Sequence, residues 1–230
     1  MTGKLTREKL SKDTILDGAM KLARREGVNF TMRALGKELN AWQNVAYDHF
    51  PTKLELQHEL LNLIVGEALT EPTIQRFQSR TNDWGERLKR FSIDLFDCLS
   101  KYRGVGHLIT HHGAAGPPNV VKLVELCLDH SAEKNFSADR SSQIFTVLTF
   151  FVAEMADLAA ATRDGLVTER FVGDSQRNDD LDPRFSEFMR TSLSTPVRDR
   201  VIIGLDIFIA GLIDEASADH PSDNGADLDR

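Results

Sequence analysis

One short segment concentrates side chains that can hydrogen-bond to nucleic acid, namely Gln43, Asn44, Tyr47 and His49. We expect them on the outer face of a short helix over residues 43–50, a segment that ends before Pro51. Such side chains bond to base edges and phosphate oxygens, and a short helix held at a fixed angle can enter a DNA major groove. The segment therefore predicts a recognition helix.

A recognition helix needs a second helix to hold it, and the preceding residues supply one. Thr31 is placed to cap a helix whose inward positions are Met32, Leu35 and Leu39. Asn40 then breaks the pattern, at the point where a helix-turn-helix needs a residue that tolerates positive φ. Together the two helices predict a helix-turn-helix unit.

Two further helices are expected to complete a compact N-terminal module. The first carries apolar residues at helical spacing from Ile15 to Ala23 and ends at Gly27, a residue suited to a helix C-terminus. The second starts near Thr52 and continues with inward apolar residues to Ile64. Two ordinary packed helices would also give the central pattern, and these flanking helices favour the DNA-binding interpretation.

Charge is divided unevenly along the chain. Residues 1–60 hold ten Lys/Arg and eight Asp/Glu, a net charge of +2, whereas the whole chain is −7, so residues 61–230 carry −9. Four basic residues, Lys4, Arg7, Lys9 and Lys12, lie at the front, where a loose arm could follow a phosphate backbone. A solvated terminus without such a role is the alternative. An acidic remainder would repel DNA and leave the basic end to make contact.

Four stretches also carry a family resemblance: Ile15-Leu-Asp-Gly-Ala-Met-Lys-Leu-Ala, Glu26-Gly-Val, Phe30-Thr-Met-Arg-Ala-Leu and Ala46-Tyr-Asp-His-Phe-Pro-Thr-Lys-Leu-Glu-Leu. Through them, residues 12–64 resemble the DNA-binding domain of tetracycline-repressor-like (TetR family) transcriptional regulators. The last stretch is the most specific, because family members usually place Tyr-x-His/Tyr-Phe-x-x-Lys there. The rest of the chain is similar only in layout, as a long all-helical body.

The resemblance implies DNA binding by seven residues: Thr31, Arg33, Gln43, Asn44, Tyr47, His49 and Lys53. The helix start at Thr31 would meet a phosphate, and Arg33 would reach a base edge or a phosphate. Gln43 and Asn44 would face bases, while the last three residues would grip phosphates and fix the register.

Four residues depart from the family pattern, namely Asn40, Trp42, Val45 and Asp48. Asn40 replaces the usual glycine of the turn, and Trp42 replaces a small or polar residue at the start of the recognition helix. Asp48 would face phosphates if turned outward, or could accept from a cytosine amine or pair with a lysine. Trp42 and Asp48 support an alternative function, an all-α enzyme or small-molecule-binding protein that has lost operator recognition.

The remaining residues predict a larger helical domain. Helix starts are expected at Asp83, Pro118, Ser137 and Pro196, whereas residues 70–82 resemble a polar connection or the end of a helix. The predicted fold is thus all-α, with a three-helix helix-turn-helix DNA-binding domain over residues 1–52 and an effector-binding and dimerisation domain over residues 53–216. Residues 217–230 form an acidic tail that is expected to be disordered. This tail is the one feature that supports a further alternative function, an adaptor that binds a partner protein.

Two helices of this domain are apolar around too much of their circumference for one core face, which indicates a second buried face against a partner subunit. They cover residues 138–163 and 197–215, and two from each chain would make a four-helix homodimer interface. The candidate interface residues are Phe150, Val201, Leu205, Phe208 and Leu212.

Candidate effector-binding residues are the aromatic and polar side chains Trp84, Phe91, His107, His112, Phe151, Glu154 and Asp157. Glu154 and Asp157 are one turn apart in an apolar helix and could bind a polar or cationic group, although a partly exposed helix edge is the favoured interpretation. His112 falls near a metal–drug ligand position of the tetracycline-repressor branch. The other expected ligands have no match, so neither a metal, nor tetracycline, nor a cofactor is predicted.

Composition sets the remaining limits on function. The sequence has 230 residues, 41% of them hydrophobic, and no run of 18 or more apolar residues, so we expect no membrane helix. Cys98 and Cys127 lie inside apolar helical patterns and fit reduced thiols in the cytoplasm, with a redox switch as the alternative. Without a catalytic motif, the sequence predicts a non-enzymatic, ligand-released repressor that binds a pseudo-palindromic double-stranded operator as a homodimer.

Overall fold

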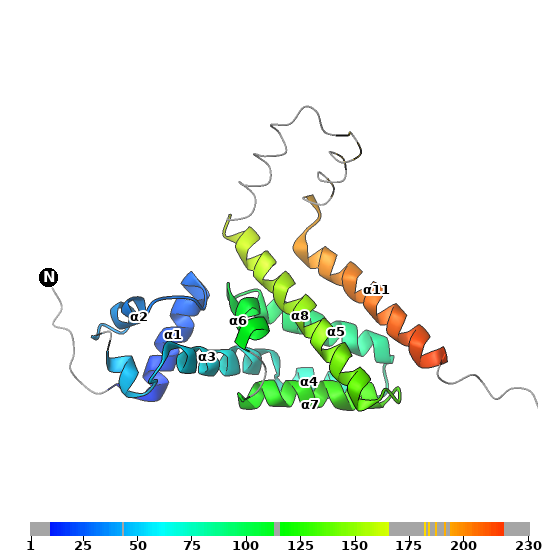
Figure 1. The fold of residues 1–230 in the computed structure, drawn as a ribbon, viewed down its shortest axis with the longest axis horizontal. Coiled ribbons are helices and arrows are strands. Elements are labelled where there is room, and N and C mark those ends of the chain that lie inside the picture. The colour runs from blue at the N-terminus through cyan, green and yellow to red at the C-terminus, as the bar shows by residue number, and fades with distance from the viewer. Residues whose placement is uncertain are drawn as a thin grey trace, which may run out of the picture.

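The computed structural model describes residues 10–42, 44–112, 116–165, 182, 184, 187, 191 and 194–218. Within these residues every regular element is a helix, which confirms the all-α class (Figure 1). The elements are α1 (Lys12–Glu26), α2 (Met32–Glu38), the 3₁₀ helix η1 (Val45–Asp48), α3 (Lys53–Ala68), α4 (Glu71–Gln78), α5 (Trp84–Leu99), α6 (Val105–His112), α7 (Pro118–Ala132), α8 (Ala138–Arg163) and α11 (Val197–Ala218).

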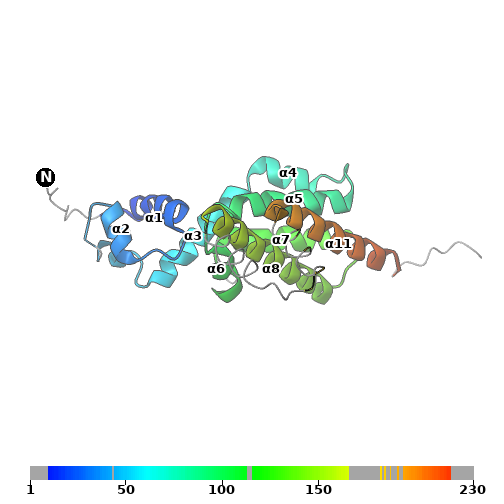
Figure 2. The same ribbon diagram turned by 90° about the horizontal axis from the view of Figure 1, so that it is seen from above.

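The molecule has a small head and a larger body. Helices α1 and α2 lie at one end with η1 and the start of α3, and the other helices gather at the opposite end (Figures 1 and 2). Helix α3 joins the two parts, because it contacts α1 in the head and also α5, α6 and α7 in the body. We refer to residues 10–52 as the head.

The helices begin at the capping residues that the sequence indicates. The side chains of Thr31, Thr52, Asp83 and Ser137 each accept a hydrogen bond from the backbone N–H three residues further on, so these predicted starts are confirmed. Asn40 has φ +49°, the left-handed conformation predicted for the turn after α2. The short polar side chain of asparagine tolerates this conformation better than other non-glycine residues do.

Two segments differ from the predicted elements. Residues 70–82 are more than a polar connection or a helix end, because they contain α4. Thr70 caps this helix, and its residues Ile74 and Phe77 are buried in the core. The predicted helix over residues 43–50 is reduced to the four-residue η1, in which Tyr47 N–H bonds to the Asn44 carbonyl. A segment with Asn, Val and Asp and with Pro51 beyond it lacks the length and the propensity for a full α-helix.

Several expectations fall on residues that the structure does not describe. These are the basic positions Lys4, Arg7 and Lys9 at the front of the chain. Of the predicted acidic tail, Ser217 and Ala218 belong to α11, and residues 219–230 lie outside the described chain.

The predicted dimer-interface residues divide between the core and the surface. Val201, Leu205 and Leu212 are at most 3% exposed and pack inside their own chain, so their assignment to a partner contact is wrong. They lie on the side of α11 that faces α5 and α8, which explains their burial. Phe208 is partly buried against the same core, and only Phe150 is an exposed member of the set.

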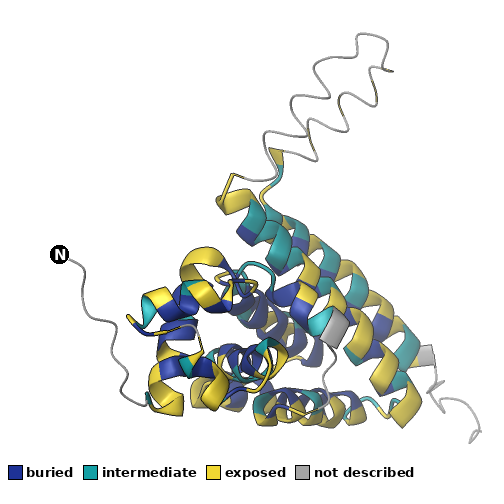
Figure 3. Cartoon of the chain, turned by 60° about the vertical axis from the view of Figure 1, so that its left-hand side comes forward, coloured by how far each residue is buried: buried dark blue, intermediate teal, exposed yellow. Residues whose placement is uncertain are grey.

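A different apolar surface remains on the outside of α8 and α11. Its members are Val147, Phe150, Ile203 and Ile207, of which Ile207 is 72% exposed. In Figure 3 these two helices carry exposed and intermediate residues along their outer sides. Among the described helices, α8 is also long and apolar enough to cross a bilayer, with 33% of its most apolar stretch buried, and it packs against α5, α6, α7 and α11.

Candidate nucleic-acid interface

The segment after the turn presents its polar side chains outward. Ala46 and Phe50 are 3% and 2% exposed and anchor the segment in the head. Asn44, Tyr47 and Asp48 are therefore left on the outer side, and Tyr47 is 44% exposed. Two of the residues predicted to contact DNA are thus available to a ligand, as is the acidic residue that departs from the family pattern.

The start of α2 adds two more predicted residues to the exposed side of the head. The Thr31 hydroxyl caps α2 by accepting from Ala34 N–H at 3.1 Å. Thr31 and Arg33 are both exposed, and Trp42 is 55% exposed. The head thus offers a guanidinium, a hydroxyl, an amide, a phenol and an indole to a partner. Gln43 lies outside the described residues.

His49 in the head and Lys53 at the start of α3 both lie close to backbone carbonyl oxygens of the head. The His49 ring Nε2 lies 2.7 Å from the Leu10 carbonyl oxygen, which ties the segment to the residues just before α1. Lys53 Nζ donates to the Asn29 carbonyl oxygen at 3.3 Å. Phosphate contacts by these two side chains, as the resemblance implies, remain a prediction.

The head is hydrogen-bonded to the body at the turn between α5 and α6. Val28 N–H donates to the Arg103 carbonyl oxygen at 2.8 Å, and the Arg103 guanidinium donates to the Glu26 carbonyl oxygen at 2.7 Å. Gly27 has φ +87°, and a Cβ there would lie 2.6 Å from the Arg103 carbonyl oxygen. Glycine is therefore required at this close approach.

A buried tyrosine adds a second connection between head and body. Arg24 Nε donates to the Tyr102 hydroxyl at 2.8 Å, and this hydroxyl donates to a Glu67 carboxylate oxygen at 2.8 Å. Arg24 also pairs with Glu67 directly. Burial, together with the Glu67 hydrogen bond, raises the pKa of Tyr102, so its hydroxyl remains protonated and able to donate. We call the contacts of Tyr102 and Arg103 with the head the joint.

Asp157 of α8 holds the start of α6, just beyond the joint. Its carboxylate accepts from Gly104 N–H at 2.8 Å and from His107 N–H at 2.9 Å. These two backbone N–H groups at the start of α6 would otherwise lack a partner within the helix. Helix α6 also lies very close to α8, since a Cβ on Gly106 would be 2.3 Å from the Ala153 carbonyl oxygen. The position of α8 is therefore linked through α6 to the joint.

The candidate effector-binding residues are spread over the body. Trp84 at the start of α5 and Phe91 in its middle are buried, whereas His107 and Glu154 are exposed near α6. The 16 residues of α5 span roughly 24 Å, so Trp84 lies at the end of α5 that is far from α6. Phe151 contacts Gly204 of α11, and the His112 side chain lies outside what the structure describes. That all seven residues bind one effector together remains a prediction.

A small apolar cavity lies elsewhere, between α3, α5, α6, α7 and α8. Its lining residues are Leu61, Val65, Leu95, Leu99, Ile109, Val120, Leu123, Phe145 and Thr149. None of the candidate effector-binding residues appears in this set. The cavity was not predictable from the sequence, because its Leu, Val and Ile residues have the same helical spacing as ordinary core residues.

The far end of the body contains a stack of rings and a buried ion pair. The His130 ring lies between Phe77 and Trp84, with ring centroids 4.4 Å and 4.7 Å away. Beside it, the Arg87 guanidinium pairs with Glu133 and donates to the Phe77 carbonyl oxygen at 2.7 Å. Both His130 ring nitrogens are buried and have no hydrogen-bond partner within the part of the chain that the structure describes.

His130 is expected to make the stability depend on pH. Burial, with the nearby Arg87 charge, lowers its pKa from 6.5 to about 4, against the opposite influence of Glu133. The unfolded chain then binds more protons between these values, so stability is lost as the pH falls from 6.5 towards 4. We expect the free energy of unfolding of His130→Phe to fall by roughly 2 to 3 kcal/mol less than that of wild type over this pH range.

Urea unfolding of wild type and His130→Phe at a series of pH values measures that difference. Glu133 also titrates in the acid range, and the hydrogen bond from Arg87, the largest cause of its lowered pKa, is present in both proteins. Parallel pH profiles for the two proteins would contradict the assignment.

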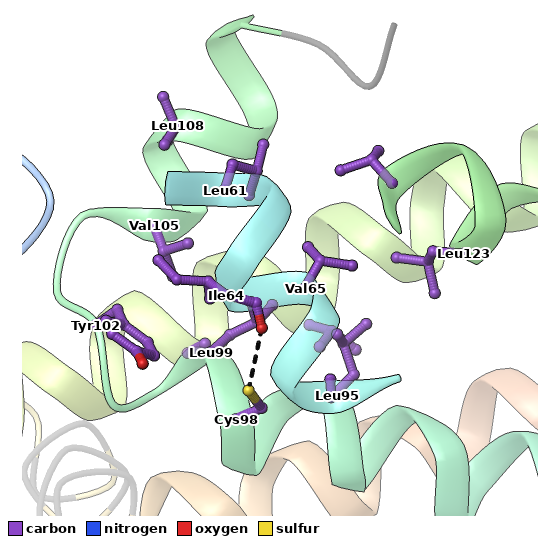
Figure 4. Packing of buried hydrophobic residues seen from close by; sticks show 14 of the residues in the cluster. Leu61, Ile64, Val65, Leu95, Cys98, Leu99, Tyr102, Val105, Leu108 and Leu123 are labelled. Atoms are coloured by element: carbon purple, nitrogen blue, oxygen red, sulfur yellow. Dashed lines mark hydrogen bonds between the residues drawn. The ribbon is translucent and has the colours of Figure 1, made fainter. Parts of the chain in front are cut away.

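The two cysteines show no sign of reactivity. Cys98 is free and buried, donates to the Ile64 carbonyl oxygen at 3.4 Å and has its pKa raised to about 11 by burial (Figure 4). Cys127 is also free, and burial raises its pKa to about 12. Such thiols are inert at neutral pH, in contrast to those of a redox switch. Among the described residues, no three His, Cys, Asp or Glu side chains are grouped to hold a metal.

Comparison with known proteins identifies the head. Residues 15–60 match the family model described as "Bacterial regulatory proteins, tetR family". The head is a tetR-family domain. The match covers α1, α2, η1 and the first half of α3, and so includes the exposed residues Thr31, Arg33, Asn44 and Tyr47. A search of curated proteins finds no match.

Solved structures resemble the whole chain, beyond the tetR-family domain. Apo ActR from Streptomyces coelicolor is 21% identical, with a TM-score of 0.73 over 93% of this chain and 99% of that one. TetR from Acinetobacter baumannii AYE is 20% identical, with a TM-score of 0.66 over 90% and 99%. BioQ, solved with its natural double-stranded DNA operator, is 22% identical, with a TM-score of 0.55 over 68% and 93%. These likenesses show a shared fold, a helix-turn-helix head on a helical body.

Proposed function

We propose that this protein is a sequence-specific transcriptional regulator, a repressor that an effector releases from its operator. The observation that carries the proposal is the exposed polar surface of a tetR-family domain, formed by Thr31, Arg33, Asn44 and Tyr47. The structure of BioQ with its operator supports DNA binding by this fold. ActR has been solved with actinorhodin, which supports a small-molecule effector.

Each head would place the segment around η1 in a major groove. Gln43 and Asn44 would face bases, and Arg33 would reach a guanine edge or a phosphate. Thr31, Tyr47, His49 and Lys53 would contact phosphates and fix the register. The −9 charge of residues 61–230 would repel DNA from the body and favour approach by the head.

Two chains would bind together as a homodimer, with half-sites about 34–36 Å apart or a multiple of that distance. The exposed apolar surface of α8 and α11, formed by Val147, Phe150, Ile203 and Ile207, supports this proposal. Its position on two neighbouring helices suits a four-helix contact between two copies.

Ile207→Glu is expected to separate the dimer. A carboxylate at the most exposed apolar position of this surface would be buried unpaired against the partner chain, so the dimer dissociation constant should rise at least tenfold. Sedimentation equilibrium measures it. The matched control is Val121→Glu on α7, at a residue that is 42% exposed outside this surface. Equal association of both variants and wild type would refute the assignment.

The effector would act through the joint. Asp157 holds the start of helix α6. Arg103 lies just before this helix in the sequence and bonds to the end of α1. A ligand that favours one position of α6 would thereby favour one arrangement of the two heads, and DNA release follows from that differential affinity.

We further propose that the protein works in the cytoplasm and has no enzymatic activity.

Selection of duplexes from a random pool tests the proposed function. We expect enrichment of a pseudo-palindromic site, with an affinity that falls steeply as salt is raised, since phosphate contacts release counterions. An all-α binding protein that has lost operator recognition would enrich no palindrome and would show no salt-dependent affinity. That outcome would reject the proposal.

A further inference from the structure

The apolar cavity of the body shows which chemical class of effector it could take. Its walls come from five helices, and Leu61, Val65, Leu95, Leu99 and Leu123 appear in one region of the core in Figure 4. Among the lining residues, Thr149 carries the one polar side-chain group, and Thr149 and Phe145 are half-buried at the α8 side. No lining residue is titratable.

We propose that this cavity binds a neutral, largely hydrocarbon effector with at most one hydrogen-bonding group, which would meet the Thr149 hydroxyl. A carboxylate or ammonium group inside these walls would lose its hydration without gaining a partner, a cost of several kcal/mol. The proposal rests on the regulatory function proposed above and specifies the chemistry of its ligand.

The size of the cavity ties ligand entry to movement of the walls. Its free volume is about 20 Å³, room for roughly one water molecule, so any hydrocarbon of useful size must push the helices apart. Two of the walls lead to the head, because Leu61 and Val65 belong to α3 and Ile109 belongs to α6. Helix α3 contacts α1, and α6 follows the joint. Entry of a ligand would therefore act on the head both through α3 and through the joint.

Three probes with the same hydrocarbon chain test the ligand class on the full-length protein without DNA: 1-octanol, octanoate and octylammonium. Isothermal calorimetry should show saturable binding of 1-octanol, with one molecule per chain. We expect both charged probes to bind at least about tenfold more weakly, because their head groups would be buried unpaired. Equal or tighter binding of either charged probe, or no binding of 1-octanol, would overturn the proposal.

Matched variants place the binding in this cavity. Val120 lines the cavity and is 5% exposed, whereas its neighbour Val121 is 42% exposed on the outside of α7. Val120→Phe should weaken 1-octanol binding about tenfold by filling the space, and Val121→Phe should leave it unchanged. If Val120→Phe does not fold, Thr149→Phe fills the half-buried side instead. Unchanged 1-octanol binding in the folded filling variant would overturn the assignment.

Operator binding distinguishes this proposal from the regulatory one. If 1-octanol binds as expected and weakens DNA binding of wild type but not of the filled variant, both proposals are supported. If it binds the cavity and DNA affinity stays constant, the ligand class is supported and the effector role fails.

Discussion

Arg33→Glu is expected to lower operator affinity about a thousandfold. Arg33 is exposed beside the capped start of α2. In a dimer, each of two heads would lose a contact of about 1–2 kcal/mol and place a carboxylate against the DNA. Their sum of about 4 kcal/mol corresponds to three orders of magnitude in the dissociation constant. Fluorescence anisotropy with a labelled operator duplex at fixed salt measures this change.

Lys122→Glu is the control for Arg33→Glu. Lys122 is exposed on α7, and its reversal alters the net charge by the same amount at a site in the body. We expect a change of less than threefold, since exposed charges more than about 10 Å apart are screened at ordinary salt. Equal losses for the two variants would mean that net charge, rather than the head, controls binding.

Glu133→Ala is expected to lower the free energy of unfolding by about 3–5 kcal/mol. The Arg87 side chain is 4% exposed, and Glu133 is its partner in a bidentate pair. Removing the carboxylate leaves a guanidinium charge buried beside His130 and the aromatic rings, a change that is strongly destabilising in other proteins. Urea denaturation at neutral pH followed by circular dichroism measures the loss.

Arg80→Ala provides the comparison for the buried pair. Arg80 lies 3.9 Å from the same carboxylate, but its side chain is 82% exposed, so we expect a loss below about 0.5 kcal/mol. A small effect of Glu133→Ala, close to that of Arg80→Ala, would show that Arg87 finds other compensation on relaxation.

The helix boundaries were predictable where local chemistry sets them. Thr31, Thr52, Asp83 and Ser137 cap helices with their own side chains, and Asn40 adopts positive φ because few other residues tolerate it. These effects depend on residues within one turn of each other. The sequence alone therefore contains the information for them.

Features that depend on tertiary packing were not predictable. The apolar residues on many sides of α11 predict a partner contact for Val201 and Leu205, which the structure buries in the core. Periodicity alone does not tell which side of such a helix faces the chain's own core. The joint combines Arg24, Glu67 and Tyr102 from distant parts of the chain. The cavity likewise requires five helices to be placed together, and no sequence spacing marks it.

Tryptophan quenching tests most directly whether the head meets DNA. The chain has two tryptophans, Trp42 beside η1, which is 55% exposed, and Trp84 in the core, which is 6% exposed. Acrylamide should therefore quench Trp42 alone in the free protein. We predict that a selected operator duplex protects Trp42 from quenching, because the groove covers the segment that starts there. Tight operator binding with unchanged quenching of Trp42 would contradict the account.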